Sequence, residues 1–221
     1  MKNLINVSLL FLTTIASNAS MAQSGRSKGD VHFKVTITNL TVGNAISPYL
    51  TVIGKRDFKL FQIGRPATPG IQGVAEMGAT AVLEEELAGQ AGVISVTKAA
   101  GGPFLANQSR TVEFDVSRED LAAGAQFNVI AMIGRSNDSF IFRQVPLAWA
   151  LRKGSVHAYS TNYDAGTEEN TGMVSDFGSG GHPTAKAEGF ISFDRGLNPR
   201  GDAPDLLTWG ERVGSILIEA E

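Results

Sequence analysis

The chain contains no cysteine, which excludes disulfide bridges, thiolate chemistry and cysteine-based zinc sites. Only 8% of its residues are aromatic and 19% are charged, and neither sign of charge dominates. The 19 Lys and Arg against 22 Asp and Glu give a net charge of -3, which provides no attraction to a nucleic-acid backbone or an anionic membrane. With 43% hydrophobic residues over 221 positions, the composition is that of an ordinary globular protein, and we expect no nucleic-acid partner.

Long hydrophobic runs are also absent, and the most apolar stretch lies near the N-terminus. Lys2 precedes an apolar segment over 4–15, and Ser20-Met21-Ala22 places small residues where a signal peptidase reads them. A membrane anchor would need about 20 apolar residues, so a cleaved signal peptide over 1–22 is favoured. We therefore expect an exported protein, periplasmic or extracellular, whose mature part over 23–221 forms one domain without a membrane span.

The hydrophobic pattern of the mature part is that of β-strands. Residues 31–40 alternate apolar and polar side chains for most of their length, as in a strand with one face on a core. Seven further β-like runs follow, at 50–53, 93–97, 111–116, 127–133, 140–142, 190–193 and 213–218. Eight candidate strands without two-residue hairpin signals predict a sandwich or barrel with long, Greek-key connections rather than a simple meander.

Two kinds of segment interrupt the strands. Residues 69–89 carry helical spacing of apolar side chains and predict one or two short helices, split at Gly78. The stretches 155–188 and 194–205 are polar and, in the first case, rich in glycine, so they are predicted to be long loops. Long loops gathered at one edge of a sandwich are a common place for function.

Three carboxylates in two of these loops form a candidate metal site. Asp138 follows the strand predicted over 127–133, and Asp164 and Glu168 lie four residues apart around Gly166. A loop that brings these three acids together needs a cation to offset their repulsion, and calcium takes six to eight oxygen ligands of this type. The alternative is that Asp164 caps a turn and Glu168 is solvated.

Five segments, taken in order, resemble the spondin N-terminal domain family. They are FKVTITNLT at 33–41, ISP at 46–48, FQIGRPATPG at 61–70, SND at 136–138 and YDAGTEEN at 163–170. The similarity extends from about residue 31 to about residue 218, and the Asp-Ala-Gly-Thr-acid motif is its most specific part.

This resemblance implies an all-β fold, an antiparallel C2-like β-sandwich with a short helical insertion, and a calcium ion held by acidic loops at one end. The family's ligand positions correspond to Asp138, Asp164 and Glu168. Glu168 stands where animal members usually have Asp, which adds one methylene group to that ligand.

Enzyme signatures are weak in this sequence. Ser179 lacks the G-x-S-x-G context of a nucleophile elbow, because residue 177 is Phe. His157 and His182 lack zinc-ligand spacing and are predicted to be surface or loop residues, and His32 is placed on the polar face of a strand. Trp149 and Trp209 are predicted to be packing residues.

The function expected from these observations is that of an exported calcium-binding β-sandwich, a non-enzymatic module for adhesion or for binding an extracellular or envelope ligand that the sequence does not name. Two alternatives stay open: a hydrolase of the cell envelope that uses the metal or the acids, and a purely structural envelope protein. A deep cleft with a perturbed acid would favour the hydrolase.

Overall fold

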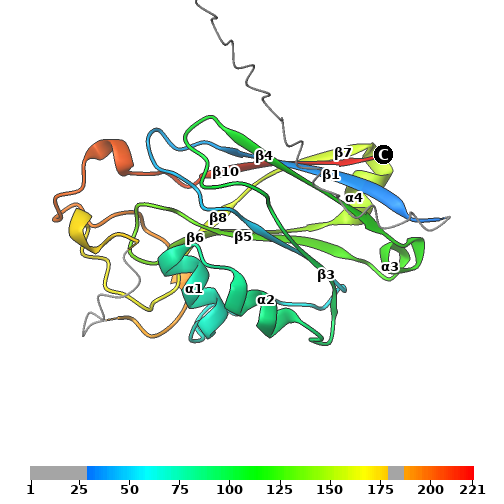
Figure 1. Cartoon of the computed structure of the whole chain (residues 1–221), viewed down its shortest axis with the longest axis horizontal. Coiled ribbons are helices and arrows are strands. Elements are labelled where there is room, and N and C mark those ends of the chain that lie inside the picture. Colours follow the sequence, from blue (N-terminus) through cyan, green and yellow to red (C-terminus); the bar gives the residue numbers. More distant parts are fainter. Residues whose placement is uncertain (1–28, 179–186) are drawn as a thin grey trace, which may run out of the picture.

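The computed structural model describes residues 29–178 and 187–221. The predicted signal peptide over 1–22, Ser179 and His182 lie outside the described residues. Ten strands form two antiparallel sheets that face each other, and two helices cover the outer face of one sheet (Figure 1). The predicted β-sandwich-like arrangement is therefore confirmed at the level of two antiparallel sheets with few helices.

The first sheet has four strands in the order β4-β1-β10-β7. Their bounds are Ser109–Val116 for β4, Val31–Asn39 for β1, Gly214–Ala220 for β10 and Ser155–Tyr159 for β7. Burial along β1 alternates strictly, and β1 pairs with both β4 and β10. The strand predicted over 31–40 from its period of two is confirmed, one residue shorter.

The second sheet has six strands in the order β3-β2-β5-β6-β8-β9. Their bounds are Val93–Lys98 for β3, Leu50–Gly54 for β2, Gln126–Met132 for β5, Ser139–Pro146 for β6, Thr161–Asp164 for β8 and Ser192–Phe193 for β9. The chain changes sheets repeatedly, for example after β1, β3 and β6, so the expectation of wiring other than a simple meander is confirmed.

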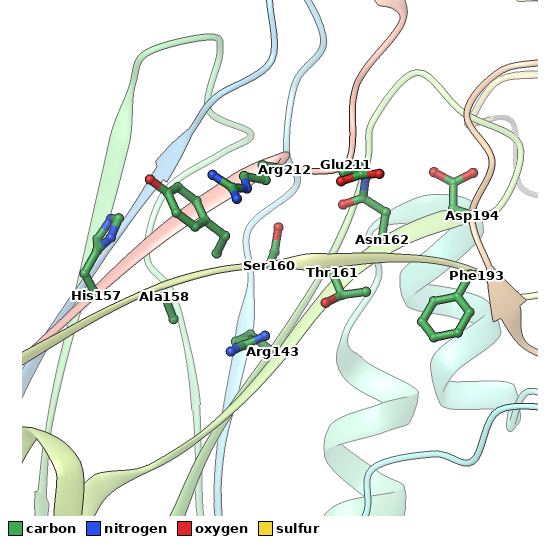
Figure 2. Close-up of a pocket in the computed structure, with 11 residues that line it drawn as sticks. Arg143, His157, Ala158, Ser160, Thr161, Asn162, Phe193, Asp194, Glu211 and Arg212 are labelled. Atoms are coloured by element: carbon green, nitrogen blue, oxygen red, sulfur yellow. The ribbon is translucent and has the colours of Figure 1, made fainter.

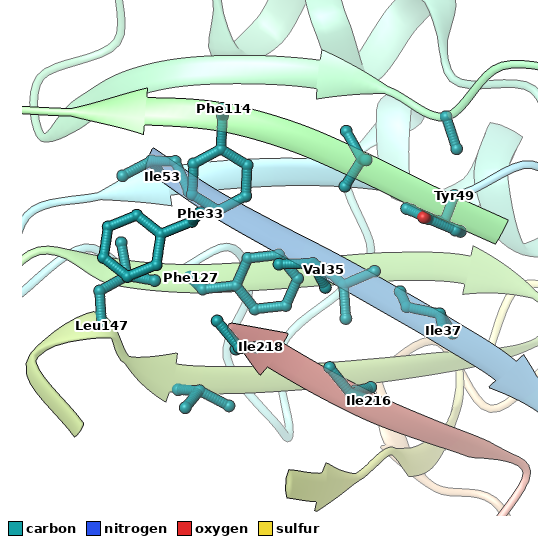
Figure 3. Packing of buried hydrophobic residues seen from close by; sticks show 14 of the residues in the cluster. Phe33, Val35, Ile37, Tyr49, Ile53, Phe114, Phe127, Leu147, Ile216 and Ile218 are labelled. Atoms are coloured by element: carbon teal, nitrogen blue, oxygen red, sulfur yellow. The ribbon is translucent and has the colours of Figure 1, made fainter. Parts of the chain in front are cut away.

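The main core fills the space between the sheets (Figure 3). Phe33, Phe114 and Phe127 stack in sequence, with ring centroids 5.8 and 6.1 Å apart. Ile216 and Ile218 of β10 are completely buried in the same cluster. Burial of such large apolar side chains is the main stabilising contribution that a cysteine-free chain has available.

A second core lies between the six-stranded sheet and the predicted helical insertion, which is α1 (Pro69–Met77) followed by α2 (Ala81–Leu87). Thr68 caps α1 through its hydroxyl, Pro69 occupies the first turn, and Gly78 ends the helix with a left-handed φ of 65°. A Cβ on Gly70 would lie 2.6 Å from Leu83 Cα, so a glycine permits the close contact of the two helices. The predicted split at Gly78 is confirmed.

Four short helical segments complete the described structure. They are α3 (Arg118–Ala122), α4 (Leu147–Lys153), and the 3-10 turns η1 (Val174–Asp176) and η2 (Asp205–Leu207). Helix α4 joins the end of β6 to the start of β7. None of the helices within 29–178 and 187–221 has the length and apolar character required to cross a membrane.

Three of the sequence-based assignments are wrong. The stretch 155–188 contains strands β7 and β8 in addition to loop, because Val156 and Ala158 pack against the inter-sheet core while polar residues occupy the other face. The strand predicted over 190–193 is only Ser192–Phe193. Trp149 is 46% exposed on α4 and is not a core residue, whereas Trp209 does pack against the main core.

Candidate functional site

Asp138 lies in the tight connection between β5 and β6. The Ser136 hydroxyl donates to Ile133 O at 2.6 Å and accepts from Ser139 N at 3.2 Å, which closes the turn. Ser136, Asn137 and Asp138 are all at least 97% buried, an unusual degree of burial for a polar turn. Asp138, the residue directly before β6, is therefore buried within a turn that hydrogen bonds close.

The pairing of β6 with β8 brings Asp164 next to Asp138. Ser139 is the cross-strand partner of Asp164, and Ala165 N donates to Asp138 O at 3.1 Å. Two carboxylates that are 26 positions apart in the sequence thus come from adjacent strand ends. The side chains of Asp138 and Asp164 are 1% and 8% exposed.

The loop after Asp164 wraps around the Asp138 carboxylate. Asp138 Oδ2 accepts from Thr167 N at 2.7 Å, from the Thr167 hydroxyl at 3.1 Å and from Glu168 N at 3.1 Å. Asp164 Oδ1 accepts from Gly166 N at 2.7 Å, so the turn-capping role considered for Asp164 is present. Glu168 is 3% exposed, which excludes the alternative that it is a solvated surface residue.

Gly166 is required at its position for two reasons. Its φ of 67° lies in the left-handed region, and a Cβ there would approach Phe190 O to 2.2 Å. The residues of the Asp-Ala-Gly-Thr-Glu segment thus have separate roles. Asp164 caps the turn, Gly166 adopts its left-handed conformation, and the backbone amides of Thr167 and Glu168 donate hydrogen bonds to Asp138.

Burial dominates the electrostatics of this site. Desolvation raises the pKa of Asp138 despite the three hydrogen bonds that it accepts. Desolvation, followed by repulsion from Asp138, raises the pKa of Asp164 to about 7, and Glu188 and Asp194 add to this repulsion. Within residues 29–178 and 187–221, neither Asp138 nor Asp164 forms a salt bridge with Lys or Arg.

Asp194 is a part of this region that the sequence analysis missed. Its carboxylate accepts from Trp209 Nε1 at 2.5 Å, from Gly196 N at 2.9 Å and from the Ser139 hydroxyl at 3.3 Å. Burial nevertheless raises the pKa of Asp194. The only signal in the sequence was its position at the start of a polar stretch, because its partners Ser139 and Trp209 are distant along the chain.

The donor chemistry of the site suits a hard cation. The residue before Asp138 has an amide oxygen, Asn137 Oδ1, that is buried and accepts no hydrogen bond from the described residues. Carboxylate and amide oxygens are the ligand types that calcium takes. The described His, Asp and Glu side chains nevertheless include no group of three or more positioned to hold a metal ion.

Several cavities border the site, and two of them are larger than 500 Å3. One, of about 510 Å3, is lined by Asp164, Glu188 and Arg195, among others. The other, of about 610 Å3, extends from Asp194 along β7 (Figure 2). Of the three histidines, His32 bonds to Asp115 at 2.8 Å on the polar face of β1 as predicted, and His157 is an exposed residue on β7.

Comparison of the chain with models of known protein families gave no match, and a search of curated proteins likewise found none that matches it.

Proposed function

We propose that the protein is an exported calcium-binding β-sandwich module with a role in adhesion or ligand binding, in the periplasm or outside the cell. The observation that carries this proposal is the buried pair Asp138 and Asp164, whose charges no lysine or arginine of the described chain offsets with a salt bridge. Burial of two neighbouring carboxylates is unfavourable unless a cation or protons neutralise them.

In this proposal Asp138, Asp164 and Glu168 are the calcium ligands, and backbone carbonyls or water complete the shell. The resemblance to the spondin domain, with its C2-like sandwich, supports the same three positions. The ion would offset the charges of Asp138 and Asp164, with which no described Lys or Arg forms a salt bridge. Its main effect is to tie the β5–β6 turn to the loop after β8, and so to stabilise the native state by mass action.

The test is thermal unfolding of residues 23–221 with excess calcium, with excess magnesium and with chelator, together with metal analysis of the protein as purified. We expect calcium to raise the melting temperature. The variant Asp164→Asn should lose that response, because the amide is a weaker ligand, yet it should be at least as stable as the wild type in chelator, because one buried charge is gone.

Asp57→Asn is the matched control, since Asp57 is exposed and distant in sequence from the three ligands. It should retain the full calcium response. If calcium does not change the melting temperature of the wild type and the purified protein contains no metal, the calcium proposal is excluded. A structural envelope protein would then be favoured.

A second candidate function, a carboxylate-dependent hydrolase of the cell envelope, is favoured by one observation. Asp164 has its pKa raised to about 7 and lines the cavity of about 510 Å3, together with Glu188. A carboxyl group that titrates near neutrality can act as a general acid. Hydrolysis of cell-envelope polysaccharide that is abolished in Asp164→Asn and retained in Asp57→Asn would support this function over the binding module.

A further inference from the structure

The cavity along β7 lies where two paired strands separate (Figure 2). Strand β8 pairs with β6 from Asp164 to Thr161, and Phe142 is the last residue of β6 with a partner there. Strand β7, which belongs to the other sheet, ends at Tyr159, so only Ser160 separates it from Thr161. The end of β6 and β7 therefore diverge, and the cavity of about 610 Å3 occupies the wedge between them.

Strand β7 presents a free edge to this wedge. It is the last strand of its sheet and pairs only with β10 among the described strands. Ser160 N donates to Gly214 O of the strand β10, and in an antiparallel pair alternate residues point to the same neighbour. His157 and Tyr159 consequently direct their backbone N–H and C=O groups away from β10, on the side that Thr161 uses to bind β6.

Two residues that line the cavity each have a buried side-chain atom without a hydrogen-bond partner among the described residues. Asn162 is 7% exposed and lines the cavity; its Nδ2 donates to Gly210 O at 2.8 Å, but its Oδ1 accepts from no described residue. Arg143 Nε is likewise buried and donates to no described residue. Unpaired buried donors and acceptors are unfavourable, so the polar interior beneath the groove is not fully satisfied by the described residues.

The charges along the wedge are separated. Arg212 lies over the Tyr159 ring, 4.5 Å from its centroid, and Arg143 of β6 also lines the cavity. Asp194 and Glu211 line the other end, beside Asn162 (Figure 2). A chain with an acidic side chain near the arginines and a basic one near Asp194 would be complementary to both ends.

We propose that this groove binds an extended peptide segment of a partner protein, which adds as a strand to the free edge of β7. An extended peptide has regularly spaced N–H and C=O groups, which match the outward backbone groups of His157 and Tyr159. The proposal rests on the ligand-binding role proposed above and specifies its partner, but it does not depend on calcium.

The experiment begins with selection of phage-displayed random peptides on the intact chain, in calcium and in chelator. The enriched peptides are synthesised with a fluorescent label, and their dissociation constants are measured by anisotropy. The decisive comparison is His157→Pro against His157→Ala. Both variants lose the imidazole and its contact with Ser215, but only proline removes the outward N–H, and that N–H takes no part in the pairing with β10.

We expect His157→Pro to weaken peptide binding roughly tenfold, the effect of one lost hydrogen bond, and His157→Ala to weaken it by less than about threefold. Arg143→Gln should weaken binding of peptides with an acidic residue and have less effect on those without one. Equal affinities of His157→Pro and His157→Ala, or a selection that enriches no peptide, would overturn the proposal.

Hydrogen exchange provides a readout that does not depend on a variant folding. In the free wild-type protein the amides of His157 and Tyr159 should exchange faster than that of Ala158, and the selected peptide should protect the first two. Unchanged exchange at both amides would refute strand addition.

Two further outcomes separate this proposal from its alternatives. If the protein binds members of a saccharide panel, and Arg143→Gln abolishes this binding while His157→Pro does not, the groove is a sugar site and the peptide proposal is overturned. If the peptide still binds in chelator and calcium does not change the melting temperature, the calcium proposal fails and the peptide proposal stands.

Discussion

Two buried regions of the molecule differ in what they bury. Around Phe33, the main core consists of stacked aromatic and aliphatic side chains. Around Asp138, a comparably buried region contains carboxylates that accept hydrogen bonds from backbone amides and form no salt bridge with a described Lys or Arg. The first region gains stability from every group that it buries, whereas the second is stable only while its hydrogen bonds hold and its charge is neutralised.

The largest expected effect is in the apolar region. Phe33→Ala should lower the free energy of unfolding by about 3–5 kcal/mol, because it leaves a cavity in the aromatic stack of Phe33, Phe114 and Phe127. The neighbouring Lys34 on the outer face is the control, and Lys34→Ala should change stability by less than about 0.5 kcal/mol. Urea titration of both variants checks this, and equal losses would contradict the alternating burial of β1.

A smaller effect is expected where the chain approaches itself in the carboxylate region. Gly166→Ala combines a left-handed φ of 67° with a clash against Phe190 O and should cost roughly 3 kcal/mol. Gly64→Ala is matched in φ, at 79°, but its Cβ would meet no atom, so it should cost only about 1 kcal/mol. If thermal unfolding gives equal losses, the close contact between Gly166 and Phe190 is not a constraint.

The charge of the carboxylate region should appear in the pH dependence of stability in chelator. The pKa of Asp164 is raised from 3.8 to about 7 on folding, so the folded state binds this proton more tightly than the unfolded state. Its contribution is therefore complete below about pH 4 and is lost as the pH rises through about 7.

The measurement is the melting temperature of the wild type and Asp164→Asn between these two pH values in chelator. Asp164→Asn should show a shallower decline, because the group that releases the proton is absent. A decline of the same slope in both proteins would show that Asp164 ionises normally in the fold. Excess calcium should reverse the wild-type trend, because calcium binds the ionised carboxylates.

The smallest effect is expected where the two regions meet. Trp209 packs against the main core and donates to Asp194. Trp209→Phe retains an aromatic ring but removes the donor, and it should cost about 1 kcal/mol. Trp149→Phe on the exposed face of α4 is the control and should be nearly neutral. Indistinguishable denaturant midpoints for the two variants would mean that the bond to Asp194 contributes nothing to stability.

Local sequence patterns were sufficient for much of the fold. The strict alternation of β1, the short helices on either side of Gly78 and the polar face that carries His32 were all predictable, since each depends on residues a few positions apart. Strands β7 and β8 were missed because their flanking sequence is polar and rich in glycine, and because β7 needs only Val156 and Ala158 to reach the core.

The candidate site shows the same division. The sequence by itself determined the loop that begins at Asp164, since a turn-capping acid and a glycine that tolerates a left-handed φ are properties of adjacent residues. Only the tertiary structure decided that Ser139 pairs with Asp164, that Asp194 is buried beside them, and that β6 and β7 part after Phe142. Strand register and burial depend on contacts between residues tens of positions apart, and no local period specifies which distant side chains they bring together.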